Sequence, residues 1–276
     1  LTLTESTIFA GTDVKKGVSM QIESVRGVHE VVIYRIENGS EVEALRETRS
    51  GEHTLNYAPE IDFTEATSKL KVVVSDGREG KEATGYVKAY VNMDVATLNV
   101  GSQPLANNAH EKYPDAFGMV SLNDLKTYSV DYAIANEANA KNIDFKFYCF
   151  GAAGSPRLYS MDNTGKDSEF SGSTGKLSAI KVKNLTRFAI LSNFDYENAT
   201  VTSISSEILS SSITQSLLDP IAVGNIIAFR TGGSSAAGGG RIGVMKVINI
   251  TEPKDLVSSN ATARVMTVEI KFPQKK

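Results

Sequence analysis

Residues 69–91, KLKVVVSDGREGKEATGYVKAYV, constrain the fold more than any other part of the chain. Apolar residues occupy every second position on both sides of the SDGREG break: Leu70, Val72 and Val74 before it, and Val87, Ala89 and Val91 after it. A period of two on both sides of a Gly/Asp turn predicts an antiparallel hairpin with one buried face. Such a hairpin commonly closes a small β-sandwich, and two-thirds of the 276 residues follow it. We therefore expect a strand-built first domain and a larger second domain.

Short candidate strands at regular spacing fill the rest of the first domain. Their ranges are Thr2–Phe9, Val18–Val25, Val31–Ile36, His53–Tyr57, Leu70–Ser75 and Gly85–Val91. Breaks between them, such as Arg26–Gly27, carry turn-forming residues, and no helical period appears. We predict an immunoglobulin-like β-sandwich over residues 1–92, with a short polar junction at Asn92–Asp94.

The second domain, residues 95–276, mixes helix and strand patterns. Residues 129–142 predict a helix with Ser129 as its N-cap and Asn142 at its C-terminal end, and residues 203–218 predict a serine-diluted helix. Strands are predicted at Asn142–Phe150, Asn225–Thr231, Ile242–Ile250 and Arg264–Phe272. The predicted fold class is mainly β with some α, a sandwich followed by a larger α+β domain rich in antiparallel strands.

Composition excludes several classes of protein. A net charge of −3 does not supply the basic surface of a nucleic-acid-binding protein, so we expect no nucleic-acid partner. Cys149 is the single cysteine, which rules out an intrachain disulfide. Because it alternates with apolar residues in a predicted strand, we expect a buried, inert thiol. The chain begins at Leu1 and not at Met, as a processed or truncated start would give.

Two glycine-rich segments resemble nucleotide-binding motifs without meeting their requirements. Residues 238–243, GGGRIG, have the G-x-G-x-x-G spacing, but a strand and not a helix is predicted after them. We expect Gly232–Gly240 to be a mobile hairpin loop without side chains to pack. Residues 172–176, GSTGK, lack the glycine and the hydroxyl residue that a phosphate loop needs on either side. No cofactor is expected.

No residue pattern predicts a metal site. The three histidines, His29, His53 and His110, have no second ligand at zinc spacing, and we expect the first two at the surface. Asp162, Asn163, Asp167 and Glu169 form an oxygen-rich cluster, but Gly165 comes too early for a calcium loop. We expect a solvated loop there, with calcium at Asp162 and Asp167 as the alternative.

Asp195 and Glu197 are the candidate catalytic pair. Residues two apart on a strand point to the same face, so the two carboxyl groups have the arrangement that glycoside hydrolysis requires. Acidic residues are common in turns, and an extracellular hydrolase is therefore kept as the alternative reading.

Tyrosine and asparagine are frequent in residues 107–163, where rings and amides together suit a sugar or a protein surface. Tyr113 and Tyr159 are expected in loops, with exposed rings held by a stiff backbone. The predicted ligand-binding residues are Tyr113, Arg157, Tyr159, Asp162 and Asn163.

Four segments carry a resemblance to a known family: NIDFKFYCFG at 142–151, VGNIIAFRT at 223–231, RIGVMKVINI at 241–250 and MTVEIKF at 266–272. Together they resemble secreted surface lipoproteins of Bacteroidetes, in which an immunoglobulin-like domain precedes a domain of unknown function. The resemblance covers Thr97–Phe272. It implies a protein at the outer-membrane surface or outside the cell, anchored by a lipidated cysteine of the precursor that this chain does not contain. It brings no catalytic residues.

The sequence as a whole predicts a non-catalytic cell-surface module that binds a glycan or a surface protein, with no metal and no cofactor. The extracellular hydrolase described above is one alternative. An adhesin or structural spacer subunit is the other, and it would present an exposed edge strand for pairing.

Overall fold

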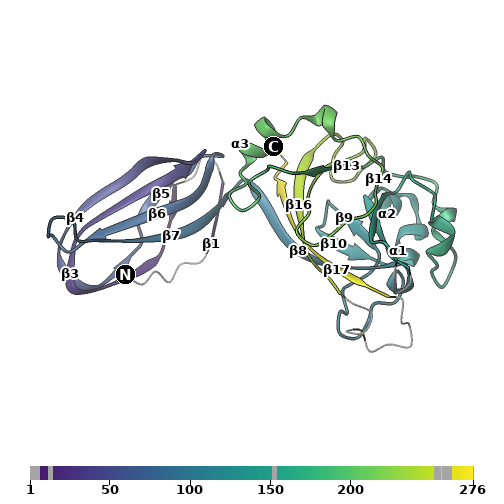
Figure 1. Cartoon of the computed structure of the whole chain (residues 1–276), viewed down its shortest axis with the longest axis horizontal. Helices are drawn as coiled ribbons and strands as arrows, with labels where there is room; N and C mark the ends of the chain where they lie inside the picture. The colour runs from purple at the N-terminus through teal and green to yellow at the C-terminus, as the bar shows by residue number, and fades with distance from the viewer. Residues whose placement is uncertain (1–6, 12–14, 151–153, 252–255, 257–262, 276) are drawn as a thin grey trace. The chain divides into compact units, whose positions relative to one another are not determined.

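The computed structural model describes residues 7–11, 15–150, 154–251, 256 and 263–275. The fold is mainly β with few helices, as predicted (Figure 1). The chain forms two compact units. The first comprises Leu1–Asp94 together with Glu197–Glu207 and Pro273–Lys276, and the second comprises Val95–Tyr196 and Ile208–Phe272. The sequence predicts the first domain as one continuous stretch, residues 1–92. In the structure, two segments from later in the chain also belong to the first unit.

The first unit contains two sheets. Its strands are β1 (Thr7–Ala10), β2 (Lys15–Gly17), β3 (Met20–Glu37), β4 (Ser40–Tyr57), β5 (Glu60–Asp62), β6 (Thr67–Ser75) and β7 (Glu82–Val91). Five of them form one sheet in the order β1-β7-β6-β3-β4, in which only the β1–β7 pair is parallel, while β2 pairs with β5. The immunoglobulin-like topology stays a prediction.

The hairpin expected in residues 69–91 is confirmed as β6 and β7. The two strands are antiparallel, with Leu70 opposite Val87 and Val74 opposite Ala83. All six alternating apolar residues are buried. Four of them are at most 2% exposed, and Val74 and Val91 are slightly more exposed. The core of this unit consists of these side chains and apolar residues of β1, β3 and β4.

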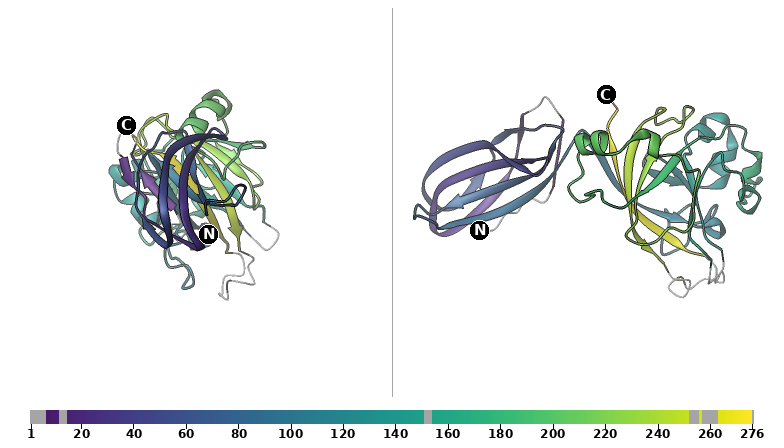
Figure 2. Two further views of the ribbon diagram at one scale, coloured as in Figure 1. Left: turned by 90° about the vertical axis from the view of Figure 1, so that its left-hand side faces the viewer. Right: turned by 45° about the horizontal axis from the view of Figure 1, so that its top comes forward.

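Strands β3 and β4 form one long bent hairpin, which Figure 2 shows from two further sides. The separate strands expected at Val18–Val25 and Val31–Ile36 are wrong, because the chain runs through the expected break as a bulged region of β3. Gly27 lies there with φ +91°, and a Cβ on it would meet the carbonyl oxygen of Gly51 at 2.3 Å. A glycine that permits close strand approach marks a bulge here and not a strand end.

The second unit has two five-stranded sheets and short helices. Its strands are β8 (Met93–Gly101), β9 (Met119–Ser121), β10 (Lys126–Tyr128), β11 (Phe145–Tyr148), β12 (Arg157–Ser160), β13 (Arg187–Leu191), β14 (Leu217–Leu218), β15 (Ile226–Arg230), β16 (Ile242–Ile250) and β17 (Val265–Pro273). The sheet orders are β10-β9-β11-β12-β14 and β13-β15-β16-β17-β8. The strands predicted near residues 225–231, 242–250 and 264–272 are confirmed as β15, β16 and β17.

Both sheets contribute to one hydrophobic core. Phe145 of β11 meets Phe188 of β13 edge-on, with 5.7 Å between ring centroids. Cys149 lies in this core and is 0% exposed, so its predicted burial is confirmed. Burial of both inner faces against each other is the main stabilising term of such a two-sheet arrangement.

The α-helices of the described chain are α1 (Val130–Ala135), α2 (Glu137–Lys141) and α3 (Val201–Glu207), and the 3₁₀ helices are η1 (Gln103–Leu105), η2 (Asp167–Glu169), η3 (Leu177–Ala179) and η4 (Ser210–Ser212). The helix α3 belongs to the first unit. Apolar residues of α1, α2 and η3 pack on the other face of the sheet that contains β11. Ser129 caps α1 as predicted, since its side chain accepts a hydrogen bond from the amide of Tyr132. Extended backbone at Asn136 divides the expected helix into α1 and α2.

The helix expected over residues 203–218 is wrong beyond Glu207. The chain continues through η4 into β14, because serine side chains compete for backbone hydrogen bonds and favour turns. None of the helices formed by the described residues has the length and apolar character needed to cross a membrane.

Candidate functional site

The structure places the two tyrosines of the predicted ligand-binding site in two separate packing clusters. Tyr159 lies in β12 and is 4% exposed, with its ring edge-on to Tyr148 at 6.0 Å. The expectation of an exposed ring in a loop is therefore wrong for Tyr159. Tyr113 does lie in a loop, between η1 and β9, where it is half-buried against a small cluster that includes Leu105 and Ala116.

The polar members of the predicted site are held by partners within the protein. Asp162 forms a two-pronged ion pair with Arg187, whose Nη1 and Nη2 lie 2.9 and 2.7 Å from its carboxylate oxygens. Arg157 forms an ion pair with Asp219 at 2.8 Å. The side chain of Asn163 donates to the hydroxyl of Ser216. These groups therefore connect neighbouring segments of the second unit.

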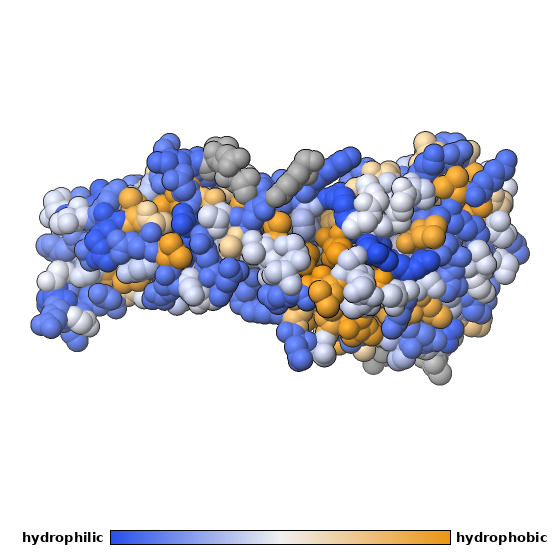
Figure 3. Space-filling model, turned by 90° about the horizontal axis from the view of Figure 1, so that it is seen from above, coloured by the Kyte–Doolittle hydropathy of each residue, from blue (hydrophilic) through white to orange (hydrophobic). Residues whose placement is uncertain are grey.

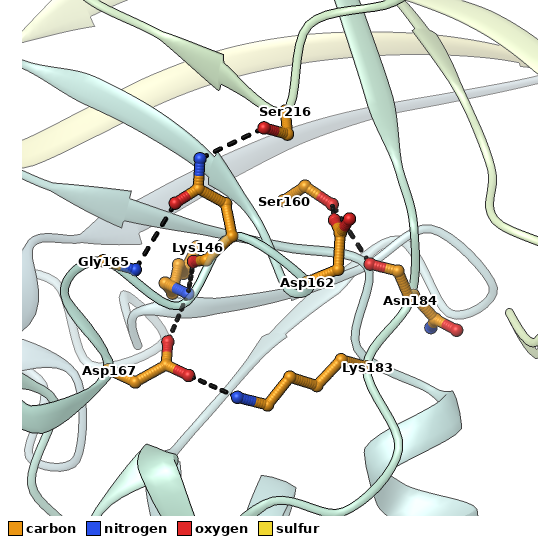
Figure 4. Close-up of polar contacts among 9 residues, drawn as sticks. Lys146, Ser160, Asp162, Gly165, Asp167, Lys183, Asn184 and Ser216 are labelled. Atoms are coloured by element: carbon orange, nitrogen blue, oxygen red, sulfur yellow. Dashed lines mark hydrogen bonds and ion pairs between the residues drawn. The ribbon is translucent and has the colours of Figure 1, made fainter.

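A buried ion cluster lies beside them (Figure 4). The Nζ of Lys146, a 0% exposed residue of β11, donates to Asp167 at 2.6 Å and to the carbonyl of Asn163 at 2.9 Å. Lys183 binds the other oxygen of Asp167 at 2.6 Å. Burial lowers the pKa of Lys146, and the hydrogen bond to Asp167 opposes this effect.

The oxygen-rich cluster considered for calcium is thus engaged by protein cations. Asp162 is bound by Arg187, Asp167 by two lysines, and Glu169 by Lys166. Among the residues that the structure describes, no group of three or more His, Cys, Asp or Glu side chains is arranged to hold a metal ion. A calcium ion would have to displace these ion pairs, and the pair of Asp167 with Lys146 is buried.

Asp144 is a second buried ionisable group. It is 0% exposed in the chain between α2 and β11, where it accepts hydrogen bonds from the hydroxyl of Ser235 at 2.6 Å and the amide of Leu122 at 2.8 Å. Burial raises the pKa of this carboxyl to about 7, and the two hydrogen bonds oppose the effect only in part.

The loop Gly232–Gly240 seals Asp144 from solvent. Ser235 is 8% exposed and Ala237 2% exposed, and the amide of Ala236 donates to the carbonyl of Lys141. The expectation of a loop with nothing to pack is therefore wrong. Small residues are required here because the loop backbone lies against its neighbours: a Cβ on Gly232 would meet the amide nitrogen of Leu185 at 2.4 Å.

The glycine-rich turn at residues 172–176 binds a carboxylate of the chain itself. The oxygens of Asp131 accept hydrogen bonds from the amides of Ser173 and Thr174 at 2.9 and 3.0 Å. These backbone hydrogen bonds hold the pKa of Asp131 well below its ordinary value. A Cβ on Gly172 would lie 2.3 Å from the same carboxylate. The turn is an anion-binding turn whose anion is Asp131.

The candidate catalytic carboxylates, Asp195 and Glu197, are both exposed. Glu197 lies 3.3 Å from Lys88 within the first unit, whereas Asp195 belongs to the second unit. The predicted surface positions of His29 and His53 are confirmed.

A groove of about 420 Å³ lies between strands β8 and β10 of the second unit. Its lining residues are Thr97, Leu98 and Asn99 of β8, Asp115 and Phe117 of the loop before β9, and Lys126 and Thr127 of β10. Thr97, Asp115 and Lys126 are exposed, and Phe117 is half-exposed. Within the described part of the chain neither charged side chain of this β8–β10 groove takes part in an ion pair. No local sequence pattern marks the groove, because Thr97 on one wall and Lys126 on the other are 29 positions apart in the sequence.

Exposed apolar side chains also gather on one face of the second unit (Figure 3). The large apolar residues of this unit that are most exposed are Phe150, Leu185, Ile190, Leu209, Val223 and Ile248. They come from β13, β16 and several loops. An apolar patch by itself does not define a ligand chemistry, and we assign no ligand to it.

The sequence matches no protein-family model and no curated protein.

Proposed function

We propose that this chain is a non-catalytic binding module and that the β8–β10 groove is its ligand site. The observation that carries the proposal is a difference in ion pairing between the charged side chains of the groove and the other charged side chains considered above. Asp115 and Lys126 face the groove without internal ion pairs, whereas Asp162, Asp167 and Asp131 are bound by neighbours. A volume of about 420 Å³ lies in the range of ligand sites.

The unusual ionisable groups support a structural role more than a catalytic one. A catalytic acid or base must reach the substrate, directly or through one water. Lys146 is enclosed by aromatic rings and ion pairs, and Asp144 lies beneath the loop Gly232–Gly240. A hydrolase that uses Asp195 and Glu197 has no further observation in its favour.

The cell-surface location and the lipid anchor rest on the sequence resemblance alone and remain predictions. The alternative of an adhesin or spacer subunit would use an exposed strand edge, and the β8–β10 groove provides edges of this kind.

A groove-filling substitution tests the proposal. Thr97→Trp places an indole in the groove at an exposed strand position, where tryptophan is well tolerated. Thr214→Trp, at another exposed threonine of the second unit, is the matched control. The purified full chain and both variants are screened against a glycan array and a phage-displayed random peptide library.

We expect hits that bind the wild type and the control but not Thr97→Trp, with unchanged circular dichroism in all three proteins. Hits that bind Thr97→Trp as well as the wild type would place the ligand site elsewhere. An absence of hits from both collections would contradict a binding function.

A further inference from the structure

The β8–β10 groove follows the backbone edges of two strands. Side chains of consecutive strand residues point to opposite faces of a sheet. Yet Thr97, Leu98 and Asn99, which are consecutive in β8, all line the groove, as do Lys126 and Thr127 in β10. A cavity that contacts both faces of a strand must run along its edge. In addition, β8 and β10 are the end strands of the two sheets.

The opposite ends of the two sheets are already joined. Phe188 of β13 and Gln215, two residues before β14, exchange backbone hydrogen bonds of 2.8 and 3.1 Å. Among the described residues no such exchange links β8 to β10. Instead, Phe117 bridges them at one point, since its carbonyl accepts from the amide of Gly101 and its amide donates to the hydroxyl of Thr127. The groove lies beside this bridge, with Phe117 as one of its lining residues.

The groove also carries charge of both signs. Asp115 and Lys126 are both exposed and both line the groove, and the hydroxyl of Thr127 donates to the carbonyl of Asp115. Thr97 and Asn99 add polar groups on the β8 side. A ligand that matches this lining needs backbone-like donors and acceptors, a cationic group for Asp115 and an anionic group for Lys126.

We propose that the groove receives an extended polypeptide segment of a partner protein, which adds as a strand between β8 and β10. A basic residue of the segment would face Asp115, and an acidic residue would face Lys126. Three paired residues would cover about 10 Å of strand. Strand addition takes its affinity from main-chain hydrogen bonds and its specificity from alternate side chains. This inference rests on the proposed function, because it names the ligand class of the same groove.

The test uses the full chain and a peptide selected from the random peptide library. Amide hydrogen exchange of the protein is measured by NMR with and without the peptide. We expect slower exchange at the amides of β8 that point to the groove, either those of Thr97 and Asn99 or that of Leu98, and at the amide of Lys126 or Thr127, since a new strand would engage them. N-methylation should weaken binding at consecutive positions of the paired segment, because a strand between two neighbours directs its amides alternately to β8 and to β10.

Charge variants test the polarity. Lys126→Glu and Asp115→Lys should each weaken binding roughly three- to tenfold, and peptides with the matching charge reversed should restore it. Lys176→Glu, at an exposed lysine outside the groove, is the control and should leave affinity unchanged.

Several outcomes separate this inference from the proposed function. Glycan hits that Thr97→Trp abolishes, without peptide hits, would overturn strand addition and leave the groove as a binding site. A selected peptide that tolerates N-methylation throughout, or that slows no amide of β8 or β10, would also overturn it. Peptide binding that Thr97→Trp does not affect would contradict both proposals.

Discussion

The buried carboxyl of Asp144 should make the protein less stable as the pH rises from about 4 to about 8. Its pKa is raised to about 7 in the folded state by burial, whereas an unfolded chain would show the ordinary value of 3.8. Between these two values the folded protein keeps a proton that the unfolded chain releases. Unfolding then releases a proton, so a higher pH favours the unfolded state.

The size of the effect follows from the difference between the two pKa values. About three pKa units at 1.36 kcal/mol each give about 4 kcal/mol in the free energy of unfolding. This stability is fully present below pH about 4 and is lost once the pH passes the folded-state pKa of about 7. Asp144→Asn removes the titration but keeps the shape, and its amide can donate to the hydroxyl of Ser235 while its oxygen accepts from the amide of Leu122.

Urea unfolding between pH 5 and pH 9 provides the measurement. The free energy of unfolding of Asp144→Asn minus that of the wild type should grow by about 3 kcal/mol over this range, because only the wild type loses the contribution. Subtraction removes the effect of the other carboxyl groups. Glu111→Gln, at an exposed carboxyl, should show no such growth. A constant difference for Asp144→Asn would refute the reasoning, because it would mean that the folded protein does not hold the proton.

Three further substitutions or deletions test the packing. Asp167→Ala leaves Lys146 buried without its carboxylate. We expect the free energy of unfolding, measured in urea, to fall by about 3–5 kcal/mol. A fall of less than about 1 kcal/mol would show that the cluster is accessible to water. Gly172→Ala introduces a methyl group that meets a carboxylate oxygen at 2.3 Å, whereas a Cβ on Gly233 has no neighbour within 4 Å. The first variant should lose about 1–3 kcal/mol and Gly233→Ala less than about 0.5, and equal losses would contradict the close packing of that turn. Deletion of Ser234–Gly239 should lower the thermal midpoint by several degrees, since it removes buried contacts; an unchanged midpoint would restore the view of a mobile loop.

The sequence pattern correctly predicted those strands that have one buried face, which gives a period of two, or that consist of a continuous apolar run. The β6–β7 hairpin, β16 and β17 are of this kind, and short-range signals also located the cap at Ser129. The pattern failed for β4, whose many charged side chains lie at the edge of a sheet and so do not alternate with a core.

The candidate sites depend on contacts that no local pattern encodes. Alternation in residues 143–149 correctly indicated one buried face, but Asp144 and Lys146 on the other face are buried too. Helices and loops from distant parts of the chain cover that face. The sequence does not reveal that Tyr159 lies in a strand, because a four-residue strand gives almost no periodic signal. The groove lies between β8 and β10, the end strands of the two sheets. Its position could not be predicted, because the order of strands within a sheet depends on the tertiary fold and not on a local pattern.

The discontinuous first unit has a consequence for synthesis on the ribosome. Its core residues lie between Ile8 and Val91, but the amide of Thr202 donates to the carbonyl of Glu65, and the amide of Gln274 donates to the carbonyl of Asn92. At ordinary translation rates Thr202 is made about 5–20 s after the last strand of that core. The sheet can therefore fold early from its own residues, while these two hydrogen bonds must wait until Thr202 and Gln274 have been synthesised. During that interval the nascent chain carries a folded sheet whose contact sites for α3 and the C-terminal segment are still free for chaperones.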